Sequence, residues 1–191
     1  MAARITWTLS GSETHMGYST LFYSVDLERL TSLVGSNDKT LSDLFAQKFP
    51  DELESRLDDN EPILADAFAD LIAKTFSHPD SGHQYGYALE MLCRIIGDHL
   101  PDDDAIGDLA PLEIASPLES PKHPINIPKE MNDFPRISYL EPTEVKIESI
   151  RLSSIDIAFP NDEDIEEARE AYKNCIDLAA EQNLAVVTFY Y

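Results

Sequence analysis

The chain has 191 residues and a formal net charge of −22, from 14 basic and 36 acidic side chains. Its length suits one domain, and a hydrophobic content of 43% is ordinary for a globular protein, which argues against wholesale disorder. Such a charge repels phosphate backbones and anionic lipids, so we expect neither nucleic acid nor a membrane as a partner. No apolar run approaches the roughly 18 residues that a membrane span requires.

Residues 1–15 are predicted to be a flexible extension ahead of a single domain over residues 16–191. They show no lasting hydrophobic periodicity, and the apolar run after Arg4 is too short for a secretory signal, so we expect a cytoplasmic protein. Cys93 and Cys175 fall in two separate helical patterns without a CxxC pair. They are therefore predicted to be core residues, not a disulfide or zinc ligands.

The first half of the domain predicts one strand followed by four helices. Aromatic and β-branched residues indicate the strand, and Asp26 and Asp38 (or Thr40) are suitable helix starts. Hydrophobic residues at helical spacing, interrupted by glycine or proline, give the remaining bounds. The predicted elements are a strand over 19–25 and helices over 26–35, 38–50, 62–76 and 85–99.

Residues 101–143 contain eight of the twelve prolines and predict a long irregular segment that wraps over the surface. A short strand is expected over 137–140. Alternating apolar and polar residues predict a second strand over 145–150 and a third over 155–159. Asn161 is expected to cap a helix that ends at Asn183, and the chain then predicts a strand over 184–190 that is buried on both faces.

These elements define an α+β fold, with a small central sheet that includes the N-terminal and C-terminal strands and is packed by about four to five helices. A charge-poor strand over 184–190 must be covered, because an exposed edge would aggregate. We therefore predict that it pairs with the strand over 19–25.

Three stretches resemble segments of an uncharacterised bacterial family, a domain of unknown function with a GYQYGYALExLC-like segment. They are the residues 17–36, the segment HQYGYALEMLC over 83–93, and the aliphatic-aromatic ending over 185–191. The resemblance covers about half of the chain and leaves the proline-rich segment unmatched. It implies no activity and no catalytic residue.

The segment from His78 to Cys93 is the richest in side chains that can take part in acid–base chemistry or in binding. A functional interpretation makes His83 a general base, Glu90 an acid or orienting group, and Tyr87 part of a pocket wall. A structural interpretation, which we favour, pairs Glu90 with Arg94 one helical turn away, turns the tyrosine hydroxyls outward and places His83 at the helix start.

Metal and cofactor signals are weak. His78 and His83 lack both a HExxH spacing and a third ligand. Residues 102–113 match a twelve-residue calcium loop only in part, because Ile106 stands where a ligand is needed and Pro111 interrupts the loop. No GxSxG, GxGxxG or GxxxxGK[ST] motif occurs, so we predict no metal, no cofactor and no nucleotide.

Acidity is the clearest functional signal. No lysine or arginine occurs between Arg56 and Lys74 or between Arg94 and Lys122, and a third acidic stretch covers 162–170. Stretches that share one face would attract a basic protein. The sequence therefore favours a non-catalytic, immunity-like binding protein of bacterial type with a basic partner. The alternative is a small enzyme or ligand-binding protein that uses the His78–Glu90 region.

Overall fold

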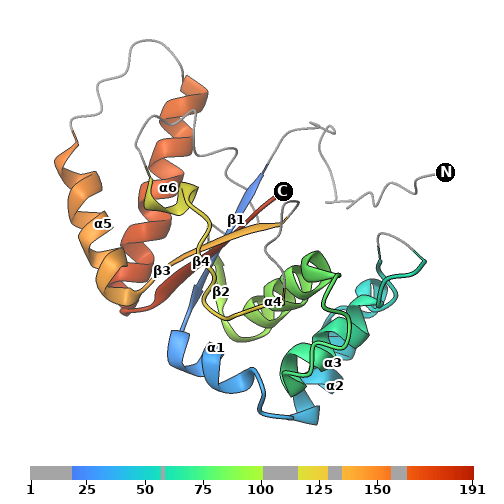
Figure 1. Ribbon diagram of the computed structural model, residues 1–191. Coiled ribbons are helices and arrows are strands. Elements are labelled where there is room, and N and C mark those ends of the chain that lie inside the picture. Colours follow the sequence, from blue (N-terminus) through green and yellow to red (C-terminus); the bar gives the residue numbers. More distant parts are fainter. Residues whose placement is uncertain (1–18, 57–58, 101–115, 129–134, 156–162) are drawn as a thin grey trace.

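The computed structural model describes residues 19–56, 59–100, 116–128, 135–155 and 163–191 (Figure 1). Several expectations lie outside these ranges: the flexible extension over 1–15, the calcium-type loop over 102–113, all but the first residue of the strand over 155–159, and the cap at Asn161.

The described residues form six α-helices, two short 3₁₀ helices and a four-stranded antiparallel sheet, which confirms the α+β class. The strands are β1 (Thr20–Val25), β2 (Asp98–Leu100), β3 (Arg136–Leu140) and β4 (Ala185–Tyr190). The α-helices are α1 (Leu27–Leu33), α2 (Lys39–Lys48), α3 (Leu64–Ala73), α4 (Gly82–Ile96), α5 (Pro142–Ser154) and α6 (Glu163–Gln182). The 3₁₀ helices are η1 (Pro50–Glu52) and η3 (Pro117–Glu119).

The predicted pairing of the first and last strands is confirmed. The strand order is β2-β1-β4-β3, and β1 pairs with β4 along its whole length, from Thr20 opposite Tyr190 to Val25 opposite Ala185. The strand β4 is therefore central, and it is buried from Ala185 to Phe189. Its flanking strands, β1 and β3, give it the cover that its apolar sequence requires.

Helices cover both faces of the sheet (Figure 1). Alternate strand residues point to opposite faces, so Tyr23 and Val25 join a core with α1 to α4, whereas Phe22 joins a core with α5 and α6. Cys93 lies in the first core and Cys175 in the second. Both are free and buried, as predicted, with the sheet between them.

The first two helices begin where the sequence predicts. The Asp26 carboxylate accepts a hydrogen bond from the Arg29 amide at 3.0 Å, and the Asp38 carboxylate accepts one from the Thr40 amide at 2.9 Å. Each carboxylate satisfies an amide that lacks an intrahelical partner.

The predicted strand over 145–150 is wrong, because these residues lie inside α5. Pro142 occupies the first turn of that helix, and Glu141 and Glu144 form a reciprocal capping box. The helix buries Val145, Glu148 and Leu152 at helical spacing. The alternation over six residues is therefore a short part of a longer helical period.

The predicted helix over 85–99 also ends too late. It ends at Ile96, and the next residues form β2, which pairs with β1. A Cβ atom on Gly97 would lie 2.5 Å from the Ser24 carbonyl oxygen and 2.6 Å from Val25 Cγ1. Only glycine lets the chain pass this close to β1 as it leaves the helix.

Candidate functional site

The three candidate residues of the sequence analysis lie on α4. His83, Tyr87 and Glu90 follow at intervals of four and three residues, which places them along one side of the helix. Glu90 and the adjoining residues up to Cys93 are buried, whereas His83 and Tyr87 are partly buried. His83 and Tyr87 are therefore the less buried positions on a helix that is otherwise buried from Gly82 to Cys93.

Glu90 is only 5% exposed and lies among tyrosine hydroxyls. Its Oε1 accepts a hydrogen bond from the Tyr23 hydroxyl of β1 at 2.9 Å, and its Oε2 accepts one from the hydroxyl of Tyr191, which follows β4. The expected pairing with Arg94 is wrong. Arg94 instead lies 3.3 Å from the Glu52 carboxylate and 4.3 Å above the Phe49 ring.

This burial raises the pKa values of the groups in the cluster. Burial raises the pKa of Glu90 above its ordinary value, although the hydrogen bonds from Tyr191 and Tyr23 partly oppose the shift. Burial and the adjacent carboxyl group also raise the pKa values of Tyr23 and Tyr191. Since both carboxyl oxygens accept a hydrogen bond inside the core, Glu90 ties α4 to the two central strands, and its burial shields it from a substrate.

Tyr87 and Glu90 are brought together by Tyr191. The Tyr87 ring stacks on the Tyr191 ring, with centroids 5.8 Å apart and planes at 19°. His83 contacts a different partner, since its Nε2 lies 2.9 Å from Oε1 of Glu61. Seven helical residues separate His83 from Glu90, a rise of about 10 Å. The two groups therefore do not form a direct acid–base pair.

The expectation that the tyrosine hydroxyls of α4 point outward is wrong for Tyr85. Its side chain is fully buried, and its hydroxyl donates to Asp70 of α3 and accepts from the His78 amide, each at 3.0 Å. Burial raises the pKa of Tyr85 to about 12. Burial also acts to raise the pKa of Asp70, but hydrogen bonds from Thr75, Ser77 and Tyr85 outweigh it and hold that pKa below its ordinary value.

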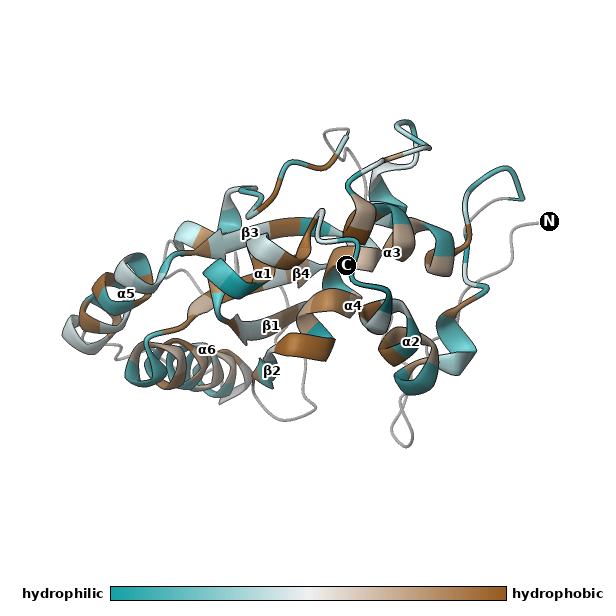
Figure 2. Cartoon of the chain, turned by 90° about the horizontal axis from the view of Figure 1, so that it is seen from below, coloured by the Kyte–Doolittle hydropathy of each residue, from teal (hydrophilic) through white to brown (hydrophobic). Residues whose placement is uncertain are grey.

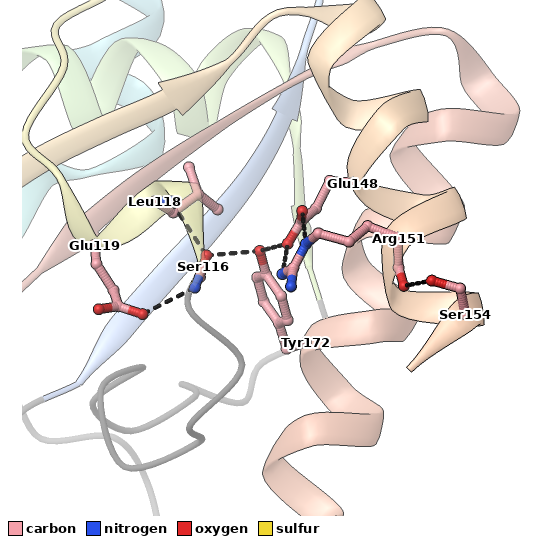
Figure 3. A network of polar contacts seen from close by, with 7 residues as sticks. All are labelled: Ser116, Leu118, Glu119, Glu148, Arg151, Ser154 and Tyr172. Carbon is pink, nitrogen blue, oxygen red and sulfur yellow. Dashed lines mark hydrogen bonds and ion pairs between the residues drawn. The ribbon is translucent and has the colours of Figure 1, made fainter. Parts of the chain in front are cut away.

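A second buried carboxylate lies across the sheet (Figure 3). Glu148 of α5 is 3% exposed and accepts two hydrogen bonds from Arg151, both at 2.6 Å, and one from the Tyr172 hydroxyl of α6 at 2.9 Å. Tyr172 lies 2.7 Å from the hydroxyl of Ser116, which in turn caps η3. The network joins α5, α6 and η3.

Sequence reasoning missed the partners in both networks. Tyr23 and Tyr191, the partners of Glu90, come from distant parts of the chain, as does Glu61, the partner of His83. The alternation over 145–150 predicts a half-buried strand at Glu148. A glutamate within an otherwise apolar run, as at Glu90, signals burial with a partner. For Glu148, the signal was the start of a helix at Pro142.

Metal binding finds no support in the part of the chain that the structure describes, where no group of three or more His, Cys, Asp or Glu side chains is placed to hold an ion. His78 is exposed at the surface, and His83 contacts Glu61. Within the same ranges, no helix has the length and apolar character to cross a bilayer.

Within the described residues, the acidic stretches occupy both sides of the sheet. The described part of the stretch before Lys74 lies beside and along α3, on the same side of the sheet as α4, whereas residues 163–170 belong to α6 on the opposite side (Figure 1). Of the acids between Arg94 and Lys122, Asp98 and Glu119 fall in the described ranges, and both are exposed.

Comparison with protein-family models identifies the class of this chain. Residues 16–191 match the model of a domain of unknown function (DUF7691), and the chain belongs to that family. The match also covers the proline-rich segment, which the resemblance seen in the sequence left out. Neither a curated protein nor a solved structure matches the chain significantly.

Proposed function

We propose that this protein is a non-catalytic, acidic interaction module that binds and neutralises a basic protein, in the manner of an immunity protein. The observation that carries the proposal is the contrast between its carboxylates. The buried carboxylates that could take part in catalysis are hydrogen-bonded within the protein. By contrast, Glu166, Glu167 and Glu170 of α6 are exposed and form no ion pair within the described ranges.

The arrangement on α4 argues against acid–base catalysis there. A general base must reach the proton that it abstracts, directly or through one water. Glu90 is buried and bonded through both oxygens to Tyr23 and Tyr191. Burial also raises the pKa of Glu90, because it disfavours the charged form.

The charge supports recognition of a basic protein. A net charge of −22 on a chain of this size sets up a negative potential that accelerates encounter with a positive surface and disfavours acidic competitors. Since exposed acids occur on both sides of the sheet, long-range attraction does not require one particular approach. Contacts on one face would then decide the final orientation.

Affinity capture with the full chain tests the proposal. We expect it to recover a basic protein at low ionic strength and to release it as salt is raised, because salt screens the interaction. The recovered protein, purified and titrated calorimetrically, should bind with an affinity that falls with salt. Co-expression should also relieve any growth inhibition that this partner causes alone.

A pair of charge variants distinguishes specific binding from general electrostatic attraction. Neutralising Glu166, Glu167 and Glu170 to glutamine should weaken the measured affinity, whereas Lys39→Gln, which removes an exposed cation of α2, should not. An acidic or neutral partner, or an affinity insensitive to salt, would overturn the proposal.

A second candidate, a ligand-binding protein or small enzyme at the start of α4, is favoured by one contact. Nε2 of His83 lies 2.9 Å from Oε1 of Glu61 but forms no hydrogen bond in the described residues, and a buried nitrogen left in this way is suited to a polar ligand. Screening a fragment library by NMR tests it. Fragments that shift the His83 ring signals, and lose affinity in His83→Gln, would support this candidate.

A further inference from the structure

Three of the large apolar side chains that are exposed in the described residues belong to one layer, that of α5 and α6. Ile147 and Ile150 of α5 are 67% and 71% exposed, and Leu178 of α6 is 43% exposed. Figure 2 shows hydrophobic residues on α5 at the outer end of the molecule, beyond the sheet. Exposed isoleucines one turn apart on a helix are unusual, and gathered apolar residues mark interaction surfaces.

These isoleucines do not lie on the side of α5 that packs against the rest of the protein. The helix buries Val145, Glu148 and Leu152. Its contact with α6 is marked by a hydrogen bond of 2.5 Å from Ser149 to Asp177. Ile147 and Ile150 therefore lie on the side of the helix that faces solvent, and burying them on a partner would remove apolar surface from water.

Carboxylates on α6 accompany this apolar surface. Glu167, Glu170 and Glu181 are exposed, and together with Leu178 they fall on one side of the helix, at spacings of three, eight and three residues. None of the three has an ion-pair partner in the ranges that the structure describes.

The cations of the same two helices are engaged within the layer. Lys146 donates to the Asn183 side chain at 2.6 Å, Arg151 to Glu148 at 2.6 Å, and Lys173 pairs with Asp177. Arg169 is 3% exposed. The outer surface therefore combines apolar side chains with negative charge that these cations do not neutralise.

We propose that the outer surface of α5 and α6, formed by Ile147, Ile150, Leu178, Glu167, Glu170 and Glu181, is the docking face for a basic, amphipathic helical segment of a partner protein. This inference rests on the proposed function and names its surface. A second copy of the chain would bring the same carboxylates together, and an anionic bilayer would be repelled. A helical segment with leucine-type residues on one side and lysines or arginines on the other would match both the apolar side chains and the carboxylates of this face.

A defined peptide tests the docking face. The probe is a synthetic helix with leucines on one side and lysines on the other, titrated by fluorescence anisotropy against the full chain. One variant carries Ile147→Ser and Ile150→Ser, and another carries Glu167→Gln, Glu170→Gln and Glu181→Gln. The matched controls lie on the other side of the sheet: Leu44→Ser for the apolar change, and Asp43→Asn, Glu54→Gln and Asp66→Asn for the charges.

We expect each variant of the docking face to weaken binding by about tenfold or more, and the controls to change it by less than about twofold. Circular dichroism establishes that every variant is folded. Equal losses in variants and controls would overturn the location but leave the proposed function standing. Failure of the peptide to bind the natural chain would overturn the stated partner chemistry, while the capture of a basic protein decides the function independently. A dimer in sedimentation that Ile147→Ser and Ile150→Ser abolish would assign the face to a second copy instead.

Discussion

At the scale of single residues, the described part of the chain places one buried glutamate on each side of the sheet, beside each of the two cores. Glu90 accepts hydrogen bonds from Tyr23 and Tyr191, and Glu148 from Tyr172 and Arg151. A buried carboxyl group without partners would cost several kcal/mol. The hydroxyl groups remove that cost and fix the position of each helix against elements that are distant in sequence.

The raised pKa of Glu90 has a consequence for stability. A carboxyl group with a higher pKa in the folded state holds its proton there more tightly, so the folded state is favoured below the ordinary glutamate pKa and loses stability as pH rises through the raised value. We expect Glu90→Gln, which is permanently neutral, to lack this loss. Its stability relative to the natural chain should improve by up to about 1.4 kcal/mol per pH unit over that interval.

Urea denaturation at a series of pH values measures the effect. Glu54→Gln is the control, because Glu54 is exposed and should give the profile of the natural chain. Parallel profiles for Glu90→Gln and the natural chain would show that the carboxyl group titrates normally.

At the scale of elements, Tyr172 links η3 to the helix layer. We expect Tyr172→Phe to lower the free energy of unfolding by about 1–3 kcal/mol, because Glu148 and Ser116 each lose a hydrogen-bond partner in the core. Hydrogen exchange should report faster exchange at the Leu118 amide, which donates to Ser116. Tyr139→Phe, on a partly buried ring, is the control and should leave that amide unchanged.

The turn between α4 and β2 depends on Gly97. We expect Gly97→Ala to lower the free energy of unfolding by about 1–3 kcal/mol, because the added methyl group would overlap the Ser24 carbonyl and the Val25 side chain. Combining it with Val25→Ala removes only the side-chain overlap, so the backbone part of the cost should remain. Thermal denaturation measures both, and an unchanged melting temperature for Gly97→Ala would contradict the close approach.

At the scale of the whole molecule, much of the architecture was predictable because it follows local patterns. The aliphatic run over 184–190 predicts a strand that must be covered, and the strand over 19–25 is the partner predicted to pair with it. The sequence prediction was wrong where both the helical and the strand periodicity fit one short segment, as at 145–150. It was also wrong where one backbone passes close to another, as at Gly97. The site was less predictable, because Glu90 meets Tyr23 and Tyr191 only after the sheet has formed.

The net charge predicts how the whole molecule responds to salt. Self-repulsion among charges that sum to −22 destabilises the compact state, so added sodium chloride should raise the melting temperature. A gain of about 1 kcal/mol corresponds to about 2–4 °C for a chain of this size. Sucrose at equal osmolality is the control, and a melting temperature that salt lowers would contradict this expectation.

The pairing of Thr20 with Tyr190 places nearly the whole sequence between two neighbouring strands. Along the chain, β1 is synthesised before all the other described elements, whereas β4, its central neighbour, is synthesised after all of them. β4 therefore joins β1 only once the whole of this region has been translated, and until then β2 and the helices α1 to α4 are the elements available to cover β1.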